Sequence, residues 1–171
     1  MYFQPLQVLK IKEIFGQAEQ LACRHFSDAQ VRAQRYDLRT LAHLEAHEVD
    51  EKAFAHLCKY GVKKGTEAEP ARQYDFYRIC LQDNRILHAV ERANSFVRFE
   101  SLMLYIAVHE LIHILRFGTG AADFDAPAPE RLKEEEKVDR ITRSVLTPLG
   151  KDMGLVLDCF SQRYDLLQSC H

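Results

Sequence analysis

The chain has 171 residues, a formal net charge of −2, 47% hydrophobic residues and 28% charged residues. These values are ordinary for soluble proteins, and they exclude a disordered chain, a collagen-like chain and a coiled-coil rod. The length predicts one domain over residues 1–171, with enough buried surface for a core. Because positive charge is not in excess, we expect no nucleic-acid partner and no attraction to anionic membranes.

The cysteines and the apolar segments bear on localisation. The 5 cysteines are scattered without a Cys-x-x-Cys pair, which excludes a zinc ribbon and favours reduced thiols. Residues 1–12 lack the long apolar segment of a signal peptide. The longest apolar stretch, residues 102–115, is interrupted by charged and imidazole side chains and is expected to be too short and too polar to cross a bilayer. The sequence therefore predicts a soluble cytoplasmic protein with no membrane partner.

The first half of the chain predicts helices and a loop. Apolar residues recur at helical spacing, and polar cap residues such as Ser27 and Asp50 mark the starts of helices. The expected helices are residues 6–26, 28–47 and 50–61, and a polar loop with Gly65 and Pro70 is expected at residues 63–71.

The second half begins with a change of pattern. Residues 74–81 alternate and are rich in aromatic and β-branched side chains, as in a strand. A turn at 82–85 and a second strand at 86–90 would complete a β-hairpin. Further helices are expected at residues 94–117, 130–149 and 151–167, with a loop at 118–129. This order favours an α+β fold that is mainly helical, with a small antiparallel sheet.

The helix at residues 94–117 contains HELIH at residues 109–113, an HExxH motif. Residues four apart lie on one face of a helix, so His109 and His113 can reach one metal ion. Glu110 lies close to that face and is expected to act as general base on a metal-activated water. The helix around it is apolar on all sides, where a glutamate is costly unless it is paired or near a metal. The competing interpretation is two hydrogen-bonded core histidines and a paired glutamate.

A second pair with the same spacing, His43 and His47, is followed by Glu48. Here the glutamate comes after the second histidine, and the neighbouring residues are mixed in polarity. We therefore expect a solvated helix end at this position rather than a metal site.

A catalytic zinc ion usually has three protein ligands, and no histidine follows His113 at a usable spacing. Three adjacent acids, Glu134, Glu135 and Glu136, lie near the start of the next expected helix. At 100° per residue, Glu135 lies about 40° from the centre of the apolar face, Glu134 about 60° on the other side and Glu136 about 140° away. We therefore expect Glu135 to complete the site, and Asp139, one turn later, to hold the second nitrogen of a histidine ligand.

The HELIH helix followed by Glu135-x-x-x-Asp139 resembles the gluzincin branch of the zincin metallopeptidases. The resemblance covers mainly residues 96–149 and implies a zincin-like fold with zinc bound by His109, His113 and Glu135 and supported by Asp139. Residues 138–148 are also similar to small intracellular zinc peptidases that act on regulators. The chain is too short for the C-terminal subdomain of large gluzincins, so it resembles a minimal member without their oxyanion-stabilising residues.

These features predict a zinc-dependent metallopeptidase, a peptide or amide hydrolase that acts on a peptide or protein. The alternatives are a non-catalytic zinc-binding regulatory or interaction module and a helical interaction domain without metal. The strand before the motif could pair with an extended substrate, although its aromatic residues fit a core-and-surface role equally well. Tyr77, His88 and Tyr164 are candidates for stabilising an oxyanion, and no spacing favours one of them. The loop at residues 118–129 is a candidate rim of the site.

Overall fold

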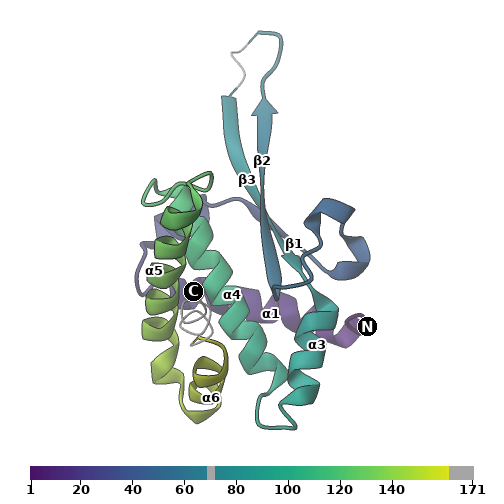
Figure 1. The fold of residues 1–171 in the computed structure, drawn as a ribbon. Helices are drawn as coiled ribbons and strands as arrows, with labels where there is room; N and C mark the ends of the chain where they lie inside the picture. Colours follow the sequence, from purple (N-terminus) through teal and green to yellow (C-terminus); the bar gives the residue numbers. More distant parts are fainter. Residues whose placement is uncertain (69–71, 162–171) are drawn as a thin grey trace.

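A computed structural model describes residues 1–68 and 72–161 of the chain. The elements, in chain order, are α1 (Pro5–Ala22), α2 (Asp28–Ala33), β1 (Tyr36–Arg39), the 3₁₀ turns η1 (Leu41–His43) and η2 (Ala46–Glu48), β2 (Ala55–Lys64), β3 (Arg72–Leu81), α3 (Asp83–Arg92), α4 (Phe99–Gly118), α5 (Ala128–Leu146), the 3₁₀ turn η3 (Thr147–Leu149) and α6 (Lys151–Phe160). The fold is α+β, and Figure 1 shows the arrangement of these elements.

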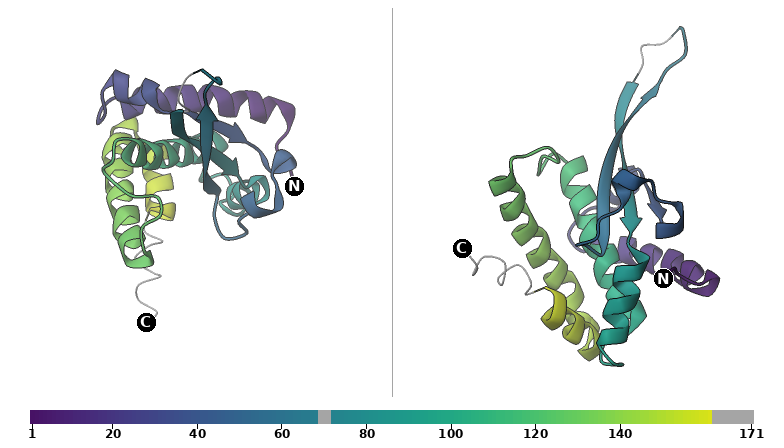
Figure 2. Two further views of the ribbon diagram at one scale, coloured as in Figure 1. Left: turned by 90° about the horizontal axis from the view of Figure 1, so that it is seen from above. Right: turned by 45° about the vertical axis from the view of Figure 1, so that its right-hand side comes forward.

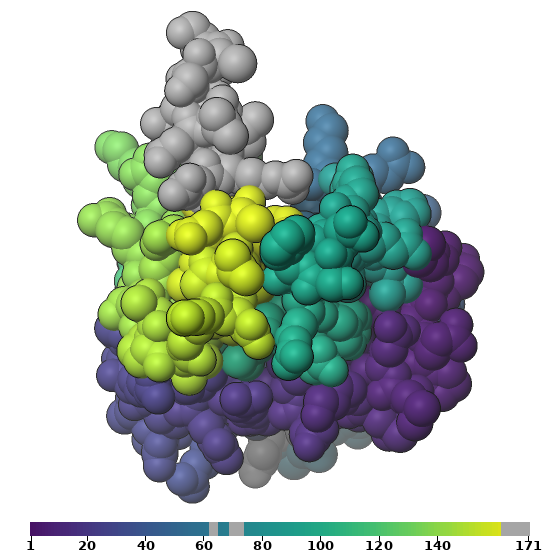
Figure 3. Space-filling view, turned by 90° about the horizontal axis from the view of Figure 1, so that it is seen from below, coloured from purple at the N-terminus to yellow at the C-terminus, as the bar shows by residue number. Residues whose placement is uncertain are grey.

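The apolar helix α4 is the centre of the fold. It is buried along most of its length between Leu102 and Leu115, and a helix that is apolar on all sides needs neighbours on each of them. α1 crosses one side, α5 and α6 lie along another, and the sheet and α3 pack elsewhere around it (Figure 1 and Figure 2). Seen from below, the yellow surface of α6 lies beside the teal surface of α3 and the segment that follows it (Figure 3). The helix that carries the HExxH motif is therefore packed against several other elements.

The sheet has the strand order β1-β3-β2, with β2 antiparallel to β3 and β1 parallel to it. It is therefore mixed, and the expectation of a purely antiparallel sheet was wrong. The hairpin of β2 and β3 extends well beyond the helical body (Figure 1 and Figure 2). β2 lies at an edge of the sheet, and part of it contacts α4. The edge strand thus lies beside the helix that carries the motif.

Two of the helix predictions for the first half of the chain were wrong. The helix expected to reach residue 47 ends at Ala33 and is followed by β1, and the segment expected as a helix at residues 50–61 contains the start of β2. Short apolar segments fit helical and strand periods about equally well. Hydrogen-bonded pairing with β3, the next element of the chain, makes this segment a strand, as the pairing of Leu57 with Ile79 illustrates.

The strand expected at residues 86–90 is instead part of helix α3. The Asp83 carboxylate accepts hydrogen bonds from the backbone N–H groups of Phe3 at 3.0 Å and Leu41 at 2.9 Å, which anchors the start of this helix. Ile86 and Ala89 are buried at helical spacing. The hairpin partner of β3 is therefore β2, across the segment expected as a loop.

The long helices were predicted correctly. The helices expected at residues 6–26, 94–117 and 130–149 correspond to α1, α4 and α5 with its 3₁₀ extension. The last expected helix begins at Lys151 as α6, and its part beyond residue 161 lies outside the described residues.

α4 is also long and apolar enough to cross a membrane, with a mean hydropathy of 1.2 over an 18-residue window. The expectation that this segment is too short therefore does not hold. However, 72% of the window is buried inside the protein, as in the core helix of a soluble protein. Burial, rather than length, accounts for its apolar composition.

Candidate metal centre

The two motif histidines lie one above the other on the same face of α4. Their Nε2 atoms are 3.3 Å apart, and the side chains are only 7% and 6% exposed. The regular helix produces this arrangement, because residues four apart are separated by about one turn. Both imidazoles therefore direct an Nε2 atom to one point on the flank of α4.

Glu135 reaches the same point from α5. One of its carboxylate oxygens, Oε2, lies 3.4 Å from Nε2 of His109, and the other, Oε1, lies 3.1 Å from Nε2 of His113. Among the described residues, these three form the group of possible ligand side chains whose donor atoms all lie within 4.8 Å of one another. The packing of α5 against α4 thus brings together the three residues expected as ligands.

The separations fit a tetrahedral metal ion. Zinc binds imidazole nitrogen at about 2.0–2.1 Å, and the ligand atoms of such a tetrahedron lie about 3.3–3.4 Å apart. The Nε2–Nε2 spacing of 3.3 Å is close to this edge length. The two oxygens of Glu135 each approach one of these nitrogens, at 3.4 and 3.1 Å, so either oxygen lies within reach of the same ion. Two imidazoles and one carboxylate are also the donor set of catalytic zinc sites that keep a fourth position for water. The three residues could therefore hold zinc without rearrangement of the helices.

The two glutamates of the site differ in the direction of their pKa shifts. Burial alone would raise the pKa of Glu135, but hydrogen bonds from His109 and His113 hold it well below its usual range. Burial raises the pKa of Glu110 to about 7; the charge of Glu135 adds to this effect and His109 opposes it. A carboxylate that is readily ionised suits a cation ligand, whereas one that titrates near neutrality suits proton transfer.

The acids on either side of Glu135 have other roles. Glu134 forms an ion pair with Arg116 of α4, and both side chains are largely buried. Glu136 is exposed. The three acids therefore point in different directions from α5, as expected from helical geometry. Glu134, however, is not peripheral, because its ion pair with Arg116 connects α5 to α4.

Asp139 does not form the expected hydrogen bond with a histidine. Both of its carboxylate oxygens accept the hydroxyl of Ser161, at 2.8 and 2.7 Å, just after α6. The Nδ1 atoms of His109 and His113 are buried and have no hydrogen-bond partner among the described residues. Ring packing orients the two imidazoles instead: the Tyr105 ring lies 5.9 Å from the His109 ring, and a Phe117 ring stacks on that of His113 at 5.7 Å.

Two cavities adjoin the centre, and His109 and Glu110 line both. The first, which we call the Arg85 cavity, has a volume of about 280 Å³. The second, the Phe124 cavity, has a volume of about 420 Å³ and is also lined by Glu135. The Arg85 cavity is lined by Lys52, Ala53, Phe54, Ala55, Arg85, Tyr105, Ile106, His109, Glu110 and Phe160. His109 and Glu110 thus border two cavities.

Sequence reasoning missed most of the residues in these walls. Tyr105 could have been found, because it precedes His109 by one helical turn and shares its face. Arg85 comes from α3, Lys52 from the segment that precedes β2, and Phe160 from α6. No local sequence pattern connects these residues to the motif. Their convergence is a product of the tertiary structure.

The candidates for stabilising an oxyanion and for the rim of the site lie in different parts of the structure. Tyr77 is buried and stacks on Phe117, and His88 is exposed on α3; neither lines either of the two cavities. Tyr164 lies outside the described residues. The loop at residues 118–129 contributes Phe124 to the wall of the Phe124 cavity, so this part of it does form a rim.

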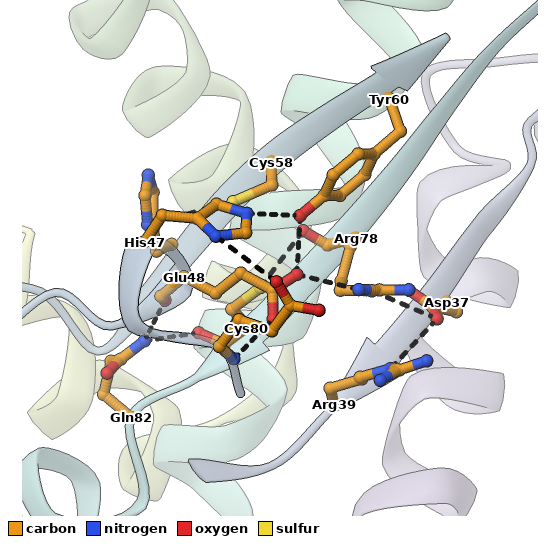
Figure 4. Close-up of polar contacts among 11 residues, drawn as sticks. Asp37, Arg39, His47, Glu48, Cys58, Tyr60, Arg78, Cys80 and Gln82 are labelled. Atoms are coloured by element: carbon orange, nitrogen blue, oxygen red, sulfur yellow. Dashed lines mark hydrogen bonds and ion pairs between the residues drawn. The ribbon is translucent and has the colours of Figure 1, made fainter. Parts of the chain in front are cut away.

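The second histidine pair, His43 and His47, is exposed in two 3₁₀ turns rather than on one helix. Glu48, expected to be solvated, is fully buried, which corrects the sequence-based interpretation. The hydroxyl of Tyr60 donates to its carboxylate at 2.6 Å and the guanidinium of Arg78 at 2.8 Å (Figure 4). The pairing of β2 with β3 brings these two partners to Glu48. The burial of Glu48 could therefore not be predicted from the residues next to it in the sequence.

The Glu48 carboxylate is ionised despite its burial. Burial would raise its pKa, but the backbone N–H of Glu45 and the side chains of Tyr60 and Arg78 lower it to about 2. Arg78 also donates to Asp37 of β1 at 3.0 Å, so the network joins η2 to three strands (Figure 4). It therefore fixes the segment that leads into residues 50–55, several of which line the two cavities.

Comparison with known proteins does not identify the chain: no family model, no curated protein and no solved structure matches it. Function must therefore be inferred from the geometry and chemistry of the site.

Proposed function

We propose that this protein is a zinc-dependent peptidase of the zincin type, with the gluzincin pattern of ligands. The observation that carries the proposal is the meeting of His109, His113 and Glu135 at 3.1–3.4 Å beside the cavity-lining carboxyl of Glu110. A structural zinc site is closed by four protein ligands and has no use for an adjacent base. Here the described residues supply three possible ligands next to two cavities, which favours catalysis.

The chain would contribute to peptide hydrolysis in two ways. His109, His113 and Glu135 would hold zinc, which when bound would polarise the scissile carbonyl and make water more acidic. Glu110 would take a proton from the attacking water and transfer it to the leaving amine nitrogen. The raised pKa of Glu110, about 7, suits a group that must first accept a proton and then release it.

The edge strand β2 would position the substrate. Ala55, His56 and Leu57 line the Phe124 cavity, and β2 has β3 on one side only among the described strands. An extended peptide that added to this edge would pass along the cavities beside Glu110. The substrate class is therefore a peptide or an extended segment of a protein.

The proposal includes a cytoplasmic location. The four cysteines in the described part of the chain are all free, including the buried Cys58 and Cys80. Reduced thiols are usual in the cytosol and uncommon in secreted proteins.

The test combines metal content with hydrolysis. Plasma emission spectroscopy should find about one zinc per chain in protein purified without chelators. Glu110→Gln should keep this zinc but lose hydrolysis of a peptide library, because it removes the base and no ligand. Equal hydrolysis by both proteins would exclude Glu110 as the base. Zinc without hydrolysis in the wild type would favour a non-catalytic zinc module, and a failure to take up any transition metal would refute the zinc centre.

A further inference from the structure

The Arg85 cavity contains a cationic side chain that forms no ion pair with the described residues. Arg85 lies in the first turn of α3 and lines the same cavity as Glu110. Its Nε atom is buried and has no hydrogen-bond partner in the part of the chain that the structure describes. The ion pairs of arginines in the described residues involve Arg32, Arg39, Arg78, Arg98 and Arg116, and not Arg85. A buried N–H donor on a permanently charged group is costly when it is unpaired. Glu110 is the acid in the lining, and it forms no ion pair with Arg85, so the guanidinium is available to an anionic ligand.

The other walls favour an anion with an apolar stem. Phe54, Ile106 and Phe160 line the cavity, and the rings of the two phenylalanines meet edge to face at 5.3 Å. Lys52 adds a second cation, and it takes part in no ion pair among the described residues. An anion in such an apolar surrounding interacts more strongly with arginine than it would in water.

The size of the cavity suits part of a peptide. An engineered cavity of about 150 Å³ holds a benzene molecule, and the Arg85 cavity has a volume of about 280 Å³. It can therefore accommodate a carboxylate side chain or a chain terminus. The guanidinium forks in a geometry that matches a carboxylate.

We propose that Arg85, assisted by Lys52, binds a carboxylate of the substrate peptide in this cavity, either an acidic side chain or the C-terminal carboxylate. The inference rests on the proposed peptidase function, because the cavity shares His109 and Glu110 with the metal centre. The site would therefore select substrates by a carboxylate close to the scissile bond.

The neighbouring Phe124 cavity has the opposite charge character. Its lining includes Asp50, Asp123, Glu134 and Glu135 together with the single arginine Arg131. A carboxylate there would meet like charges. The two cavities therefore differ in preference: a carboxylate is favoured in the Arg85 cavity and disfavoured in the Phe124 cavity.

The first experiment measures binding without requiring hydrolysis. The full-length chain, incubated with zinc, is titrated with N-acetyl-glutamate amide, N-acetyl-glutamine amide or N-acetyl-alanine with a free C-terminus. The Nε–H signal of Arg85 in a ¹⁵N–¹H spectrum, assigned by its loss in Arg85→Lys, is the readout. We expect a carboxylate probe to shift this signal and the glutamine probe to leave it unchanged. A shift with the glutamate probe identifies an acidic side chain, and a shift with the alanine probe identifies a chain terminus.

Variants separate this site from adventitious binding. Arg85→Gln should weaken the carboxylate probe at least about tenfold, Arg85→Lys should retain part of the affinity, and Arg92→Gln, an exposed arginine on the same helix, should not change it. Equal shifts with the glutamate and glutamine probes, or unchanged affinity in Arg85→Gln, would overturn the proposal. Binding to the metal alone would appear as affinity that does not depend on Arg85.

The second experiment separates failure of this inference from failure of the peptidase proposal. Hydrolysis is measured on peptides that carry glutamate or glutamine at matched positions on either side of each cleaved bond. Active wild-type enzyme with no preference for the carboxylate overturns the Arg85 inference and leaves the peptidase proposal intact. Absence of hydrolysis refutes the peptidase proposal, while the spectroscopic titration still tests whether Arg85 binds a carboxylate.

Discussion

At the scale of single residues, the three adjacent acids of α5 show how one helical step changes a role. Glu135 faces the histidines, Glu134 pairs with Arg116, and Glu136 faces solvent. We expect Glu135→Ala to weaken zinc binding at least about 100-fold, because two imidazoles would remain as protein ligands. Zinc affinity is measured by competition with a chromophoric chelator.

Glu136→Ala is the matched control and should change zinc affinity less than about twofold, since an exposed acid on the same helix contributes little. Glu134→Ala should retain zinc but lower the free energy of unfolding by about 2 kcal/mol, because Arg116 loses its partner. Zinc retained by Glu135→Ala and lost by Glu134→Ala would show that Glu134, rather than Glu135, is the third ligand.

Asp139 provides a second prediction at the residue scale. Its carboxylate binds Ser161 rather than a histidine, so we expect Asp139→Asn and Ser161→Ala to leave zinc affinity within about twofold. Each should instead lower the free energy of unfolding by about 1 kcal/mol, the usual contribution of a side-chain hydrogen bond. Chelator competition and urea unfolding measure the two effects. A 10–100-fold loss of zinc affinity in Asp139→Asn would mean that it supports a ligand after all.

At the scale of elements, the Glu48 network holds the 3₁₀ segment η2 against the sheet. The ionised form of Glu48 stabilises the fold because its pKa is lowered from 4.5 to about 2. This contribution is present above about pH 4.5 and is lost as the pH falls towards 2. We therefore expect Glu48→Gln to lower the free energy of unfolding by about 3 kcal/mol at neutral pH, since Arg78 loses a buried partner.

Urea unfolding of wild type and Glu48→Gln at several pH values between 3 and 7 measures this effect. The difference between the two proteins should be greatest near neutrality and should narrow below about pH 4.5. Glu45→Gln, an exposed glutamate in the same segment, serves as the control and should show little difference at any pH. A difference between wild type and Glu48→Gln that does not depend on pH would show that Glu48 is not ionised in the folded protein.

At the scale of the whole molecule, the proposed ligands come from two helices of the core, α4 and α5. A metal ion that binds only the folded state stabilises it by mass action, by about 2.7 kcal/mol at a free concentration of 100 times Kd. We expect zinc to raise the melting temperature of the wild type by several degrees and a chelator to reverse the change. The matched control is Glu135→Ala, which should show little response to the same zinc concentration. An equal response in both proteins would locate the zinc elsewhere.

The sequence predicted the features that depend on local geometry. The apolar helix α4, the shared face of His109 and His113 and the inward direction of Glu135 follow from 3.6 residues per turn, whatever the helices pack against. The order of the long helices was predicted for the same reason, because extended periodic patterns distinguish a helix from a strand better than short ones do. Whether zinc binds there remains a prediction of the motif.

Tertiary structure decided the features in which distant residues meet. Residues 55–61 become a strand because β3 pairs with them, and Glu48 becomes buried because the same pairing brings Tyr60 and Arg78 to it. Asp139 meets Ser161 only after α6 has folded back along the core. The cavity around Arg85 is likewise formed by α3, α4, α6 and the segment before β2. Helical periodicity fixes directions within one element, whereas strand pairing and cavity walls depend on contacts between elements, which no local pattern encodes.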